Sequence, residues 1–243
     1  MKYIAVDTET TGMDPEKDKL VEIAAVPSKG VHRSTLVNPG VKQIDFGAMA
    51  VHHITQDMVK DAPGPLDAIA AVGLADLDKT DTLVFHNAEF DRRFLPSNLL
   101  AQPWICTYRC ALHLVPNAES HSNGSLWYEL GLDHPMPEDA GKMPHRALFD
   151  AIMTFDIVSH FIDKHFVESA DADPTKLDIG MALAYLISLS TSPVVLSKCN
   201  FGKHRGQSWA EIPSDFMRWV LKQDFDFDTR FTCQHWLTER RHG

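Results

Sequence analysis

The amino-acid sequence predicts an α/β fold in which a mixed five-stranded sheet is flanked by helices and followed by a small C-terminal module. Three observations predict it. Strand-like runs joined by short turns open the chain, strand-like and helical segments then alternate, and the charge changes sign near the C-terminus. The 243 residues are enough for one large domain or two smaller ones, each with a buried core.

The first three strands are predicted at 3–8, 21–26 and 32–37, because these runs are rich in β-forming residues and end at turn residues. Their short connections favour an antiparallel meander. Runs at 82–85 and 104–105 predict two further strands. Since helical segments separate these two strands from the meander, we expect a sheet of mixed direction.

Helices are predicted where apolar residues recur at helical spacing between turn-forming residues. The predicted helices are 65–77, 88–95, 107–114, 125–130, 144–164 and 177–189. Pro144 suits the first turn of the longest of them. The remainder of 116–143 contains most of the turn-forming residues and is predicted to be irregular.

The charge is distributed unevenly. The formal net charge is −10, but segment 198–222 contains five basic and two acidic residues, which leaves −13 for the rest of the chain. The polar stretch 168–174 has no periodicity and predicts a linker. The sequence therefore predicts three parts: an α/β domain at 1–166, a linker with a short helix at 167–197 and a small basic module at 198–243.

Composition excludes several classes of protein. A hydrophobic fraction of 44% and a charged fraction of 23% are those of a globular protein rather than a disordered one. No run of eighteen apolar residues is present, so no membrane span is expected, and the acidic Asp7 interrupts any signal-like start. Four cysteines do not make a disulfide scaffold, which predicts a reducing, cytoplasmic location. The acidic balance argues against a protein that coats nucleic acid, but not against a nucleic-acid enzyme.

Two carboxylates end the first predicted strand. Asp7 and Glu9 are two residues apart, so they project to the same side of a strand. Side by side they repel each other, and a divalent cation between them is the simple compensation. The alternative is an exposed acidic strand end without a ligand.

Two later segments add further polar groups. Asn87 and Asp91 follow the apolar run 82–85 at the start of a predicted helix, where Asn87 could serve only as a helix cap. His145 and Asp150 lie five residues apart, so they share one site only if His145 is at or before the start of its helix.

The set Asp7-x-Glu9, Asp91 and His145-x4-Asp150 resembles the DEDDh family of 3′→5′ exonucleases. Other segments that resemble this family lie at 49–55 and 104–107, and the resemblance covers about residues 1–165. Further phrases resemble one branch of the family that carries a C-terminal extension and differ from minimal proofreading subunits. These phrases lie at 90–93, 104–107, 145–148, 201–206 and 218–219.

The resemblance implies an RNase H-like metal-dependent exonuclease that releases 5′-mononucleotides from DNA 3′ ends. It implies two divalent ions, Mg²⁺ with Mn²⁺ as a substitute, which stabilise both the attacking and the leaving oxygen. By analogy, Asp7 would contact both ions, Glu9 and Asp150 the ion that carries the attacking water, and Asp91 the other. His145 would be the general base, since the ordinary pKa of histidine is about 6.5.

Substrate contacts are predicted on two parts of the chain. In the α/β domain they are Thr8, Thr10, His52 and Asn87, although His52 could equally be a packed structural histidine. In the basic module they are Lys203 and Arg205, which lie in a glycine-bounded turn suited to phosphates. Trp209 and Trp219 could stack on bases, but tryptophans in so small a module are more often its core.

Other functions stay open at this point. An exoribonuclease or a polymerase proofreading subunit of the same superfamily would use the same catalytic set, because the 2′-hydroxyl is sensed by other contacts. A non-catalytic nucleic-acid-binding protein would be expected to have lost part of that set. Single-stranded DNA is taken as the working substrate, and a role in DNA repair or processing is inferred from the resemblance alone. Cys106, Cys110 and His113 lack a fourth zinc ligand, so buried thiols are expected there.

Overall fold

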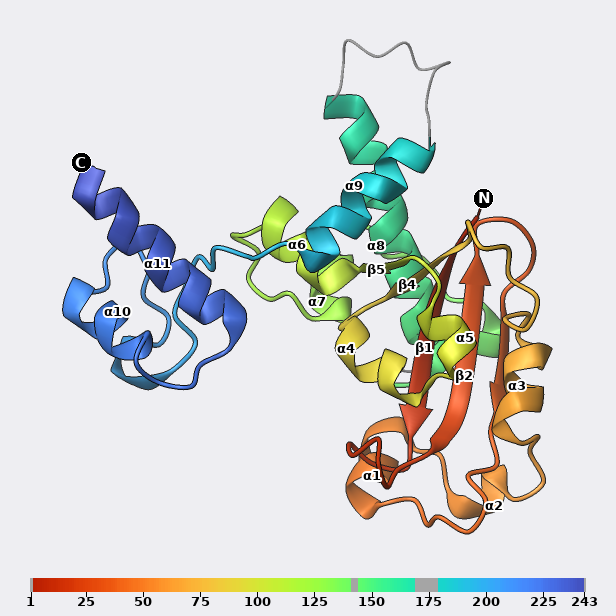
Figure 1. Ribbon diagram of the computed structural model, residues 1–243. Helices are drawn as coiled ribbons and strands as arrows, with labels where there is room; N and C mark the ends of the chain where they lie inside the picture. Colours follow the sequence, from red (N-terminus) through yellow and green to blue (C-terminus); the bar gives the residue numbers. More distant parts are fainter. Residues whose placement is uncertain (1, 141–143, 169–178, 243) are drawn as a thin grey trace.

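A computed structural model describes residues 2–140, 144–168 and 179–242, and its centre is a five-stranded mixed sheet. The strands are β1 (Tyr3–Thr10), β2 (Leu20–Pro27), β3 (Arg33–Leu36), β4 (Thr82–Phe85) and β5 (Trp104–Cys106), in the order β3-β2-β1-β4-β5. β1, β2 and β3 are antiparallel neighbours, whereas β4 runs parallel to β1 and to β5 (Figure 1). The predicted fold class is confirmed.

Helices surround the sheet and form most of the C-terminal part of the chain. The α-helices are α1 (Phe46–His52), α2 (Gln56–Val59), α3 (Pro65–Ala71), α4 (Ala88–Asp91), α5 (Ser97–Leu100), α6 (Thr107–Leu114), α7 (Asn123–Glu129), α8 (Ala147–Glu168), α9 (Ile179–Thr191), α10 (Ser214–Val220) and α11 (Phe227–His242). Short 3₁₀ turns are η1 (Arg92–Phe94), η2 (Glu138–Ala140) and η4 (Gly202–His204).

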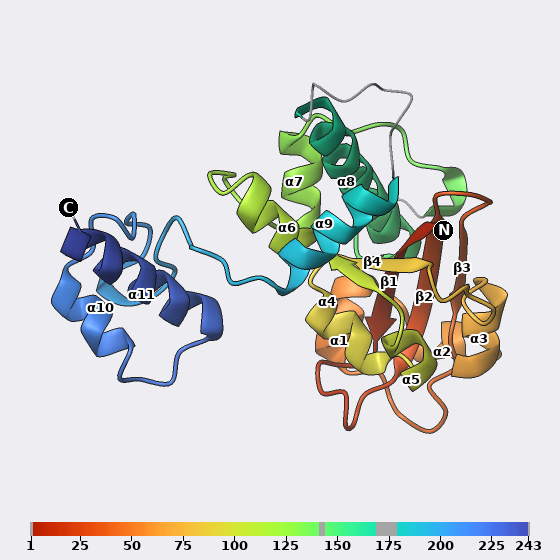
Figure 2. The same ribbon diagram turned by 45° about the horizontal axis from the view of Figure 1, so that its top comes forward.

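The two faces of the sheet bury separate hydrophobic cores. Along β1, Ala5 packs into the core that α6, α7, α8 and α9 complete, whereas Ile4 and Val6 pack into the core that includes α3, α4 and α5 (Figure 2). Side chains alternate between faces along a strand, so Asp7 and Glu9 continue the face that α8 covers. The packing of β1 thus decides which layer receives its two carboxylates.

The longest helix starts later than the sequence predicts. α8 begins at Ala147, not at Pro144, because His145 has a φ of 64° and this left-handed conformation cannot continue an α-helix. Similarly, the helix predicted at 65–77 ends at Ala71, two residues before Gly73 adopts a φ of 83°. The helix predicted at 88–95 is divided into α4 and η1.

The remaining elements differ by a few residues from the prediction. α6 matches 107–114, α7 lies at 123–129 instead of 125–130, and β3 is shorter than 32–37. The sequence reasoning missed α1, α2 and α5, which have four to seven residues and too few turns for a helical pattern to emerge. It also missed α10 and α11 of the C-terminal module, where it predicted no helix. Most of the predicted linker at 168–174 lies outside the described residues.

The chain beyond residue 178 belongs to two different cores. α9 packs Leu183 and Leu186 into the same core as α8, so this helix is part of the sheet domain as the structure describes it. The segment 199–237 has a core of its own that includes Trp209 and Met217. The predicted boundary at 166/167 stays a prediction, whereas the change of core falls between α9 and Leu196.

An ion pair connects the two cores. Arg109 of α6 contacts Asp228 of α11 at 2.7 Å between Nη1 and Oδ2, and both side chains are largely buried. Arg109 also donates to the carbonyl of Ser192, and Asp228 accepts the backbone N–H of Val194. These bonds fix the connector between α9 and the C-terminal module against α6. No helix among the described residues has the length and apolar character that crossing a membrane requires.

Candidate active site

The candidate site forms where the pairing between β1 and β4 ends. Their parallel pairing ends at Ala5 and Val84, and β4 stops at Phe85, whereas β1 continues to Thr10. The far half of β1 therefore has a free edge toward α4. In α/β sheets such a divergence at the carboxyl end of a parallel strand is a usual place for a ligand.

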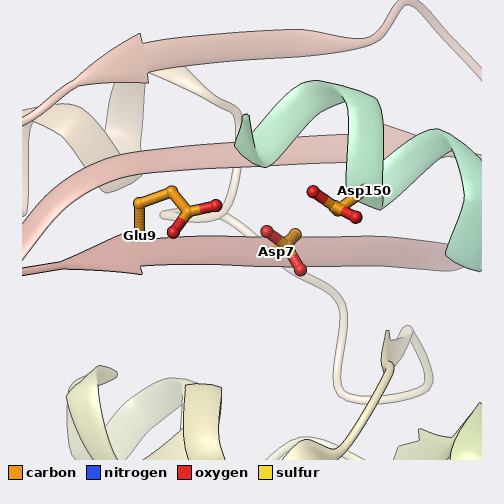
Figure 3. A group of neighbouring side chains, drawn as sticks. All are labelled: Asp7, Glu9 and Asp150. Carbon is orange, nitrogen blue, oxygen red and sulfur yellow. The ribbon is translucent and has the colours of Figure 1, made fainter. Parts of the chain in front are cut away.

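Three carboxylates meet at this place from two elements. Asp7 and Glu9 leave β1 on one face, and Asp150 approaches from the first turn of α8 (Figure 3). One oxygen from each lies within 4.8 Å of the others, and no other such group of potential metal ligands occurs among the described residues. The structure thus brings together residues more than 140 positions apart in the sequence.

Asp91 lies at the free edge of β1, beside this group. Its Oδ1 accepts the Thr8 backbone N–H at 3.1 Å and the Thr8 hydroxyl at 2.7 Å. Asp91 is buried, and its charge raises the pKa of Asp7. Thr8 therefore holds a carboxylate in place, and its hydroxyl is committed to that bond rather than directed to a substrate.

Burial and the charge of neighbouring carboxylates raise the pKa values of all four carboxyls. Burial, followed by the charge of Asp91, raises the pKa of Asp7 well above its usual range. Burial and then Asp150 raise the pKa of Glu9 to about 8, and burial raises the pKa of Asp91 to about 7. Burial also raises the pKa of Asp150. Such shifts are the electrostatic signature of a site that lacks compensating positive charge.

The donor set fits a divalent cation. Asp7, Glu9 and Asp150 offer hard oxygen ligands at mutual distances that one small ion can span, and Asp91 adds a fourth carboxylate nearby. Arg146 lowers the pKa of Glu9, but burial and three neighbouring carboxylates outweigh it. A cation between the carboxylates would remove most of this electrostatic cost.

A buried ion pair that the sequence reasoning missed supports the start of α8. Glu22 of β2 stands opposite Glu9 in the sheet and binds Arg146 through two bonds, of 2.6 Å and 3.1 Å. Glu22 also accepts the backbone N–H of Ala147 at 2.9 Å. The sequence did contain a signal for this pair, because Glu22 lies inside the apolar run of the second strand. A carboxylate in such a run is expected to be buried, and buried carboxylates normally have a partner.

His145 lies immediately before α8, as a shared site with Asp150 requires. Its backbone N–H donates to Asp150 Oδ2 at 2.7 Å, and its left-handed backbone ends the loop that leads into the helix. The residue is exposed, and its imidazole is not part of the three-carboxylate group. The structure thus places the His145 main chain at the site and leaves its side chain exposed.

His52 is buried and both of its ring nitrogens have backbone partners. Ile54 N–H donates to Nδ1 at 3.0 Å, so Nε2 carries the proton and donates to the carbonyl of Thr10 at 3.1 Å. Burial lowers the pKa of His52, which keeps the ring neutral. These bonds favour the structural role, in which His52 fixes α1 against the end of β1.

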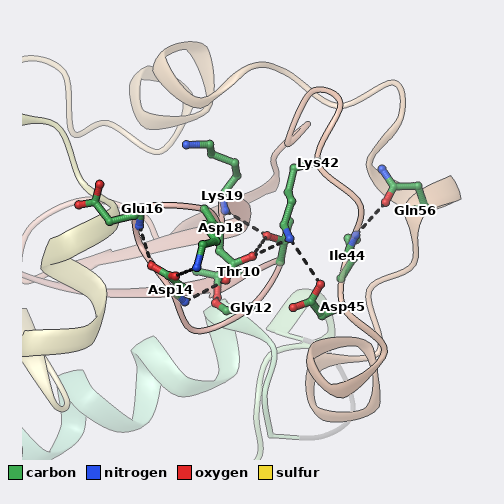
Figure 4. Close-up of polar contacts among 12 residues, drawn as sticks. Thr10, Gly12, Asp14, Glu16, Asp18, Lys19, Lys42, Ile44, Asp45 and Gln56 are labelled. Atoms are coloured by element: carbon green, nitrogen blue, oxygen red, sulfur yellow. Dashed lines mark hydrogen bonds and ion pairs between the residues drawn. The ribbon is translucent and has the colours of Figure 1, made fainter.

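The loop after β1 is held by a polar network. Thr10 donates its hydroxyl to the Gly12 carbonyl, while Asp18 binds Lys42 at 3.2 Å and accepts the Asp14 N–H (Figure 4). A Cβ at Gly12 would lie 2.5 Å from Asp18 Oδ2, so only glycine fits this approach. The network keeps the loop folded back beside Glu9.

A cavity of about 690 Å³ opens beside Glu9, one of the three grouped carboxylates. Glu9 and Thr10 border it on one side and Asn87 and Phe90 on the other, with His52 in its wall. Asn87 has a φ of 62° and makes no capping bond, so the alternative role as a helix cap is absent from the structure. Its exposed amide is therefore available to a ligand in the cavity.

The two predicted phosphate contacts lie elsewhere. Lys203 and Arg205 are exposed on the η4 turn of the C-terminal module, and neither borders this cavity. All four cysteines are free and buried, as expected for Cys106 and Cys110.

Residues 4–158 match a family model described as an exonuclease, of the RNase T type. The chain belongs to this exonuclease family. The DEDDh resemblance and the predicted enzyme class, an exonuclease that hydrolyses phosphodiester bonds, are thereby confirmed. The branch that the C-terminal phrases resemble is that of exodeoxyribonuclease X.

Relatives of this exonuclease include the Escherichia coli K12 protein named exodeoxyribonuclease 10. It is 28% identical over 238 residues, which cover 96% of this chain and 97% of the relative. The DNA polymerase III subunit epsilon of Treponema pallidum is 30% identical over 174 residues, which cover 67% of this chain and 77% of that protein. The first similarity therefore extends through the C-terminal module.

Solved structures support the same family. Exonuclease X in complex with 5′ overhanging duplex DNA is 32% identical with a TM-score of 0.57, and the match covers 73% of this chain and 99% of that one. The nuclease domain of 3′hExo, a DEDDh member, has a TM-score of 0.51 at 18% identity, covers 67% of this chain and 92% of its own, and shows the fold alone.

Glu22→Gln is expected to destabilise this exonuclease. The change removes one charge of a largely buried pair and leaves Arg146 without its carboxylate, which costs about 3 kcal/mol in the free energy of unfolding. Urea denaturation measures the effect. Asp57→Asn is the matched control, since the Asp57–Lys60 pair is exposed and its loss should leave that free energy unchanged. Equal effects of the two changes would contradict a structural role for Glu22.

The stability of the metal-free protein should fall as the pH rises. Raised carboxyl pKa values mean that the folded state binds protons more tightly than the unfolded state. The free energy of unfolding therefore decreases between the usual pKa of Glu9, 4.5, and its raised value of about 8. Melting temperatures in EDTA across this interval measure the decrease, and Mg²⁺ should raise them most at the alkaline end. A metal effect that is independent of pH would contradict the shared carboxylate site.

Proposed function

We propose that this exonuclease removes nucleotides one at a time from the 3′ end of DNA and releases 5′-mononucleotides. The observation that carries the proposal is the group of Asp7, Glu9 and Asp150 beside a cavity of about 690 Å³, in a member of the DEDDh family. Asp91 and His145 complete the family's set of five residues in the order that the family requires.

The catalytic carboxylates are proposed to hold two divalent ions, Mg²⁺ by preference with Mn²⁺ as a substitute. Asp7, Glu9 and Asp150 would bind one of them together, and Asp91 would help Asp7 to hold the other. When bound, the metal supplies an activated water and neutralises the charge that develops on the phosphate. Thr8 would act on this set indirectly, by orienting Asp91 through its two hydrogen bonds.

His145 is proposed as the general base that takes the proton from the attacking water at a ring nitrogen. Three features support this role. The residue precedes α8, its backbone N–H bonds to Asp150, and its side chain is exposed beside the site rather than packed. Histidine is the side chain that most often serves as a general base near neutral pH.

The cavity beside Glu9 is proposed as the site of the terminal nucleotide. Its wall combines apolar groups such as Val51 and Phe90 with the polar Thr10 and Asn87, and such a mixture suits a base and a sugar together. Asn87 offers a free amide to the sugar or the phosphate. His52 would contribute by holding the Thr10 carbonyl and thereby the cavity wall.

Two features of the relatives favour DNA over RNA as the substrate: their names, and the share of this chain that each match covers. The exodeoxyribonuclease of E. coli matches 96% of this chain, including the C-terminal module, whereas the proofreading subunit of T. pallidum matches 67%. The solved relative with 32% identity is described in complex with 5′ overhanging duplex DNA. An exoribonuclease and a proofreading subunit are the alternatives to be tested. A preference for single strands, a role in DNA repair or processing and a cytoplasmic location complete the proposal.

His145→Ala should lower the rate of nucleotide release by a factor of about 100 or more, because the proton acceptor is lost. The binding of Mn²⁺, followed by electron paramagnetic resonance, should persist because the four carboxylates are unchanged. His134→Ala, which changes an exposed histidine that pairs with Asp156, is the matched control and should keep its rate. A near-normal rate in the His145 variant would remove this residue from the role of base.

A single gel assay tests both the direction of cleavage and the preferred substrate. The purified protein with Mg²⁺ should shorten a 5′-labelled single-stranded DNA from its 3′ end, faster than an RNA of the same sequence. The doubly substituted Asp7→Ala/Asp150→Ala protein should leave both strands intact, because its metal site has lost two ligands. Faster cleavage of the RNA would move the substrate to the exoribonuclease alternative. Intact strands with both Mg²⁺ and Mn²⁺ would overturn the proposed activity.

A further inference from the structure

The two tryptophans of the basic segment have opposite environments. Trp209 is 0% exposed and lies in the core of the C-terminal module, whereas Trp219 is 48% exposed on α10. The Trp219 ring is held by Phe216, at 5.4 Å between centroids, and by the edge of Phe225 at 5.9 Å. Phe216 and Phe225 therefore hold the Trp219 ring in place while about half of it faces solvent. Trp219 is not part of the hydrophobic core of the module.

Exposed basic residues flank the aromatic cluster that supports Trp219 along the chain. His204 of the η4 turn packs against Phe216, with 4.5 Å between ring centroids, so the turn lies on the same side of α10 that supports Trp219. The residues on either side of His204, Lys203 and Arg205, are exposed. Arg205 donates from Nε to the Asn200 carbonyl, and this bond holds the side chain against the turn.

Two further cations come from α10 itself and the residues after it. Arg218 precedes Trp219, and Lys222 follows it by three positions, and both are exposed. The segment 198–222 carries a net charge of +3 even after the exposed Glu211 and Asp215 are counted, in a chain whose other residues sum to −13. Two of these cations therefore lie within three residues of Trp219 in the chain, and two more lie on the turn that packs against Phe216 beneath it.

This combination matches one class of ligand. A single-stranded nucleic acid has unpaired bases that stack on aromatic rings and phosphates that attract lysine and arginine. A protein partner would gain little from several exposed cations around a single ring, and a double-stranded nucleic acid keeps its bases stacked inside the helix. Charge complementarity thus favours a single strand as the occupant of this surface.

We propose that α10 and the η4 turn form a second binding site for single-stranded nucleic acid, in which a base stacks on Trp219 and phosphates contact Lys203, Arg205 and Arg218. This inference rests on the proposed function, since the strand held here would be the one whose 3′ end is hydrolysed. The site lies in the module with the separate core, away from the carboxylate group of the sheet domain (Figure 2). It would hold nucleotides upstream of the end and keep a long strand bound between successive cleavages.

The ion pair between Arg109 and Asp228 gives this second site a defined position. Asp228 is in the first turn of α11, so its bonds to Arg109 and to the Val194 N–H attach the module to α6 of the sheet domain. A strand of sufficient length could therefore contact both sites at once, and its affinity would exceed that of a strand limited to the cavity.

Binding to the full chain in EDTA tests the inference without cleavage. Fluorescence anisotropy with a labelled oligothymidylate of about 25 nucleotides should give a dissociation constant that rises roughly 5- to 100-fold in Trp219→Ala, the effect of losing one stacked base. Trp219→Phe should keep most of the affinity because it retains a ring. Phe227→Ala, which changes another exposed aromatic residue of the module outside the basic segment, is the matched control and should bind as the unchanged chain does.

The same variants separate this site from the catalytic one. Trp219→Ala should raise KM for the long strand with Mg²⁺ and leave kcat unchanged. It should hydrolyse the 4-nitrophenyl ester of thymidine 5′-monophosphate, which is too short to contact the module, at the normal rate. Equal affinities of Trp219→Ala and the unchanged chain for the long strand would overturn the inference, as would an equal loss of affinity for a blunt duplex. Failure of the unchanged chain to hydrolyse either substrate would overturn the proposed function, while the anisotropy would still decide the second site.

Discussion

The crowding of four carboxylates around β1 is the constraint on which the candidate site depends. Burial, and after it the charge of neighbouring carboxylates, raises the pKa values of Asp7, Glu9, Asp91 and Asp150. A fold tolerates such a group only where the surrounding structure enforces it and a cation can offset the charge. The same arrangement that costs stability without metal offers the hard oxygen ligands that a divalent ion prefers.

The enforcement comes from backbone groups and from one buried cation. Thr8 offers its N–H and hydroxyl to Asp91 at the free edge of β1, and the N–H of His145 holds Asp150 at the start of α8. Arg146 pairs with Glu22 and thereby joins that start to β2, next to Glu9. Asp91 and Asp150 are therefore positioned by backbone N–H groups at the free edge of a strand and just before a helix.

The uneven distribution of charge between the sheet domain and the C-terminal module is consistent with binding of a negatively charged substrate. The sheet domain gathers the carboxylates of the candidate site, and their negative charge would repel the phosphates of a substrate in the absence of a cation. The C-terminal module contains the segment with a net charge of +3, apart from these carboxylates. The ion pair between Arg109 and Asp228 keeps the two parts attached without merging their cores.

The sequence by itself determined the fold class and the five residues of the candidate site. Strand and helix periodicities are local, so β1, β4 and α6 could be placed to within two residues, and Asp7 and Glu9 could be assigned to one side of a strand. Only the tertiary structure decided which distant groups meet. It showed that Glu22 pairs with Arg146, that Thr8 and His52 support the site through hydrogen bonds, and that Trp219 is exposed while Trp209 is core. These outcomes depend on contacts between elements far apart in the sequence and on the left-handed turn at His145, which no local pattern encodes.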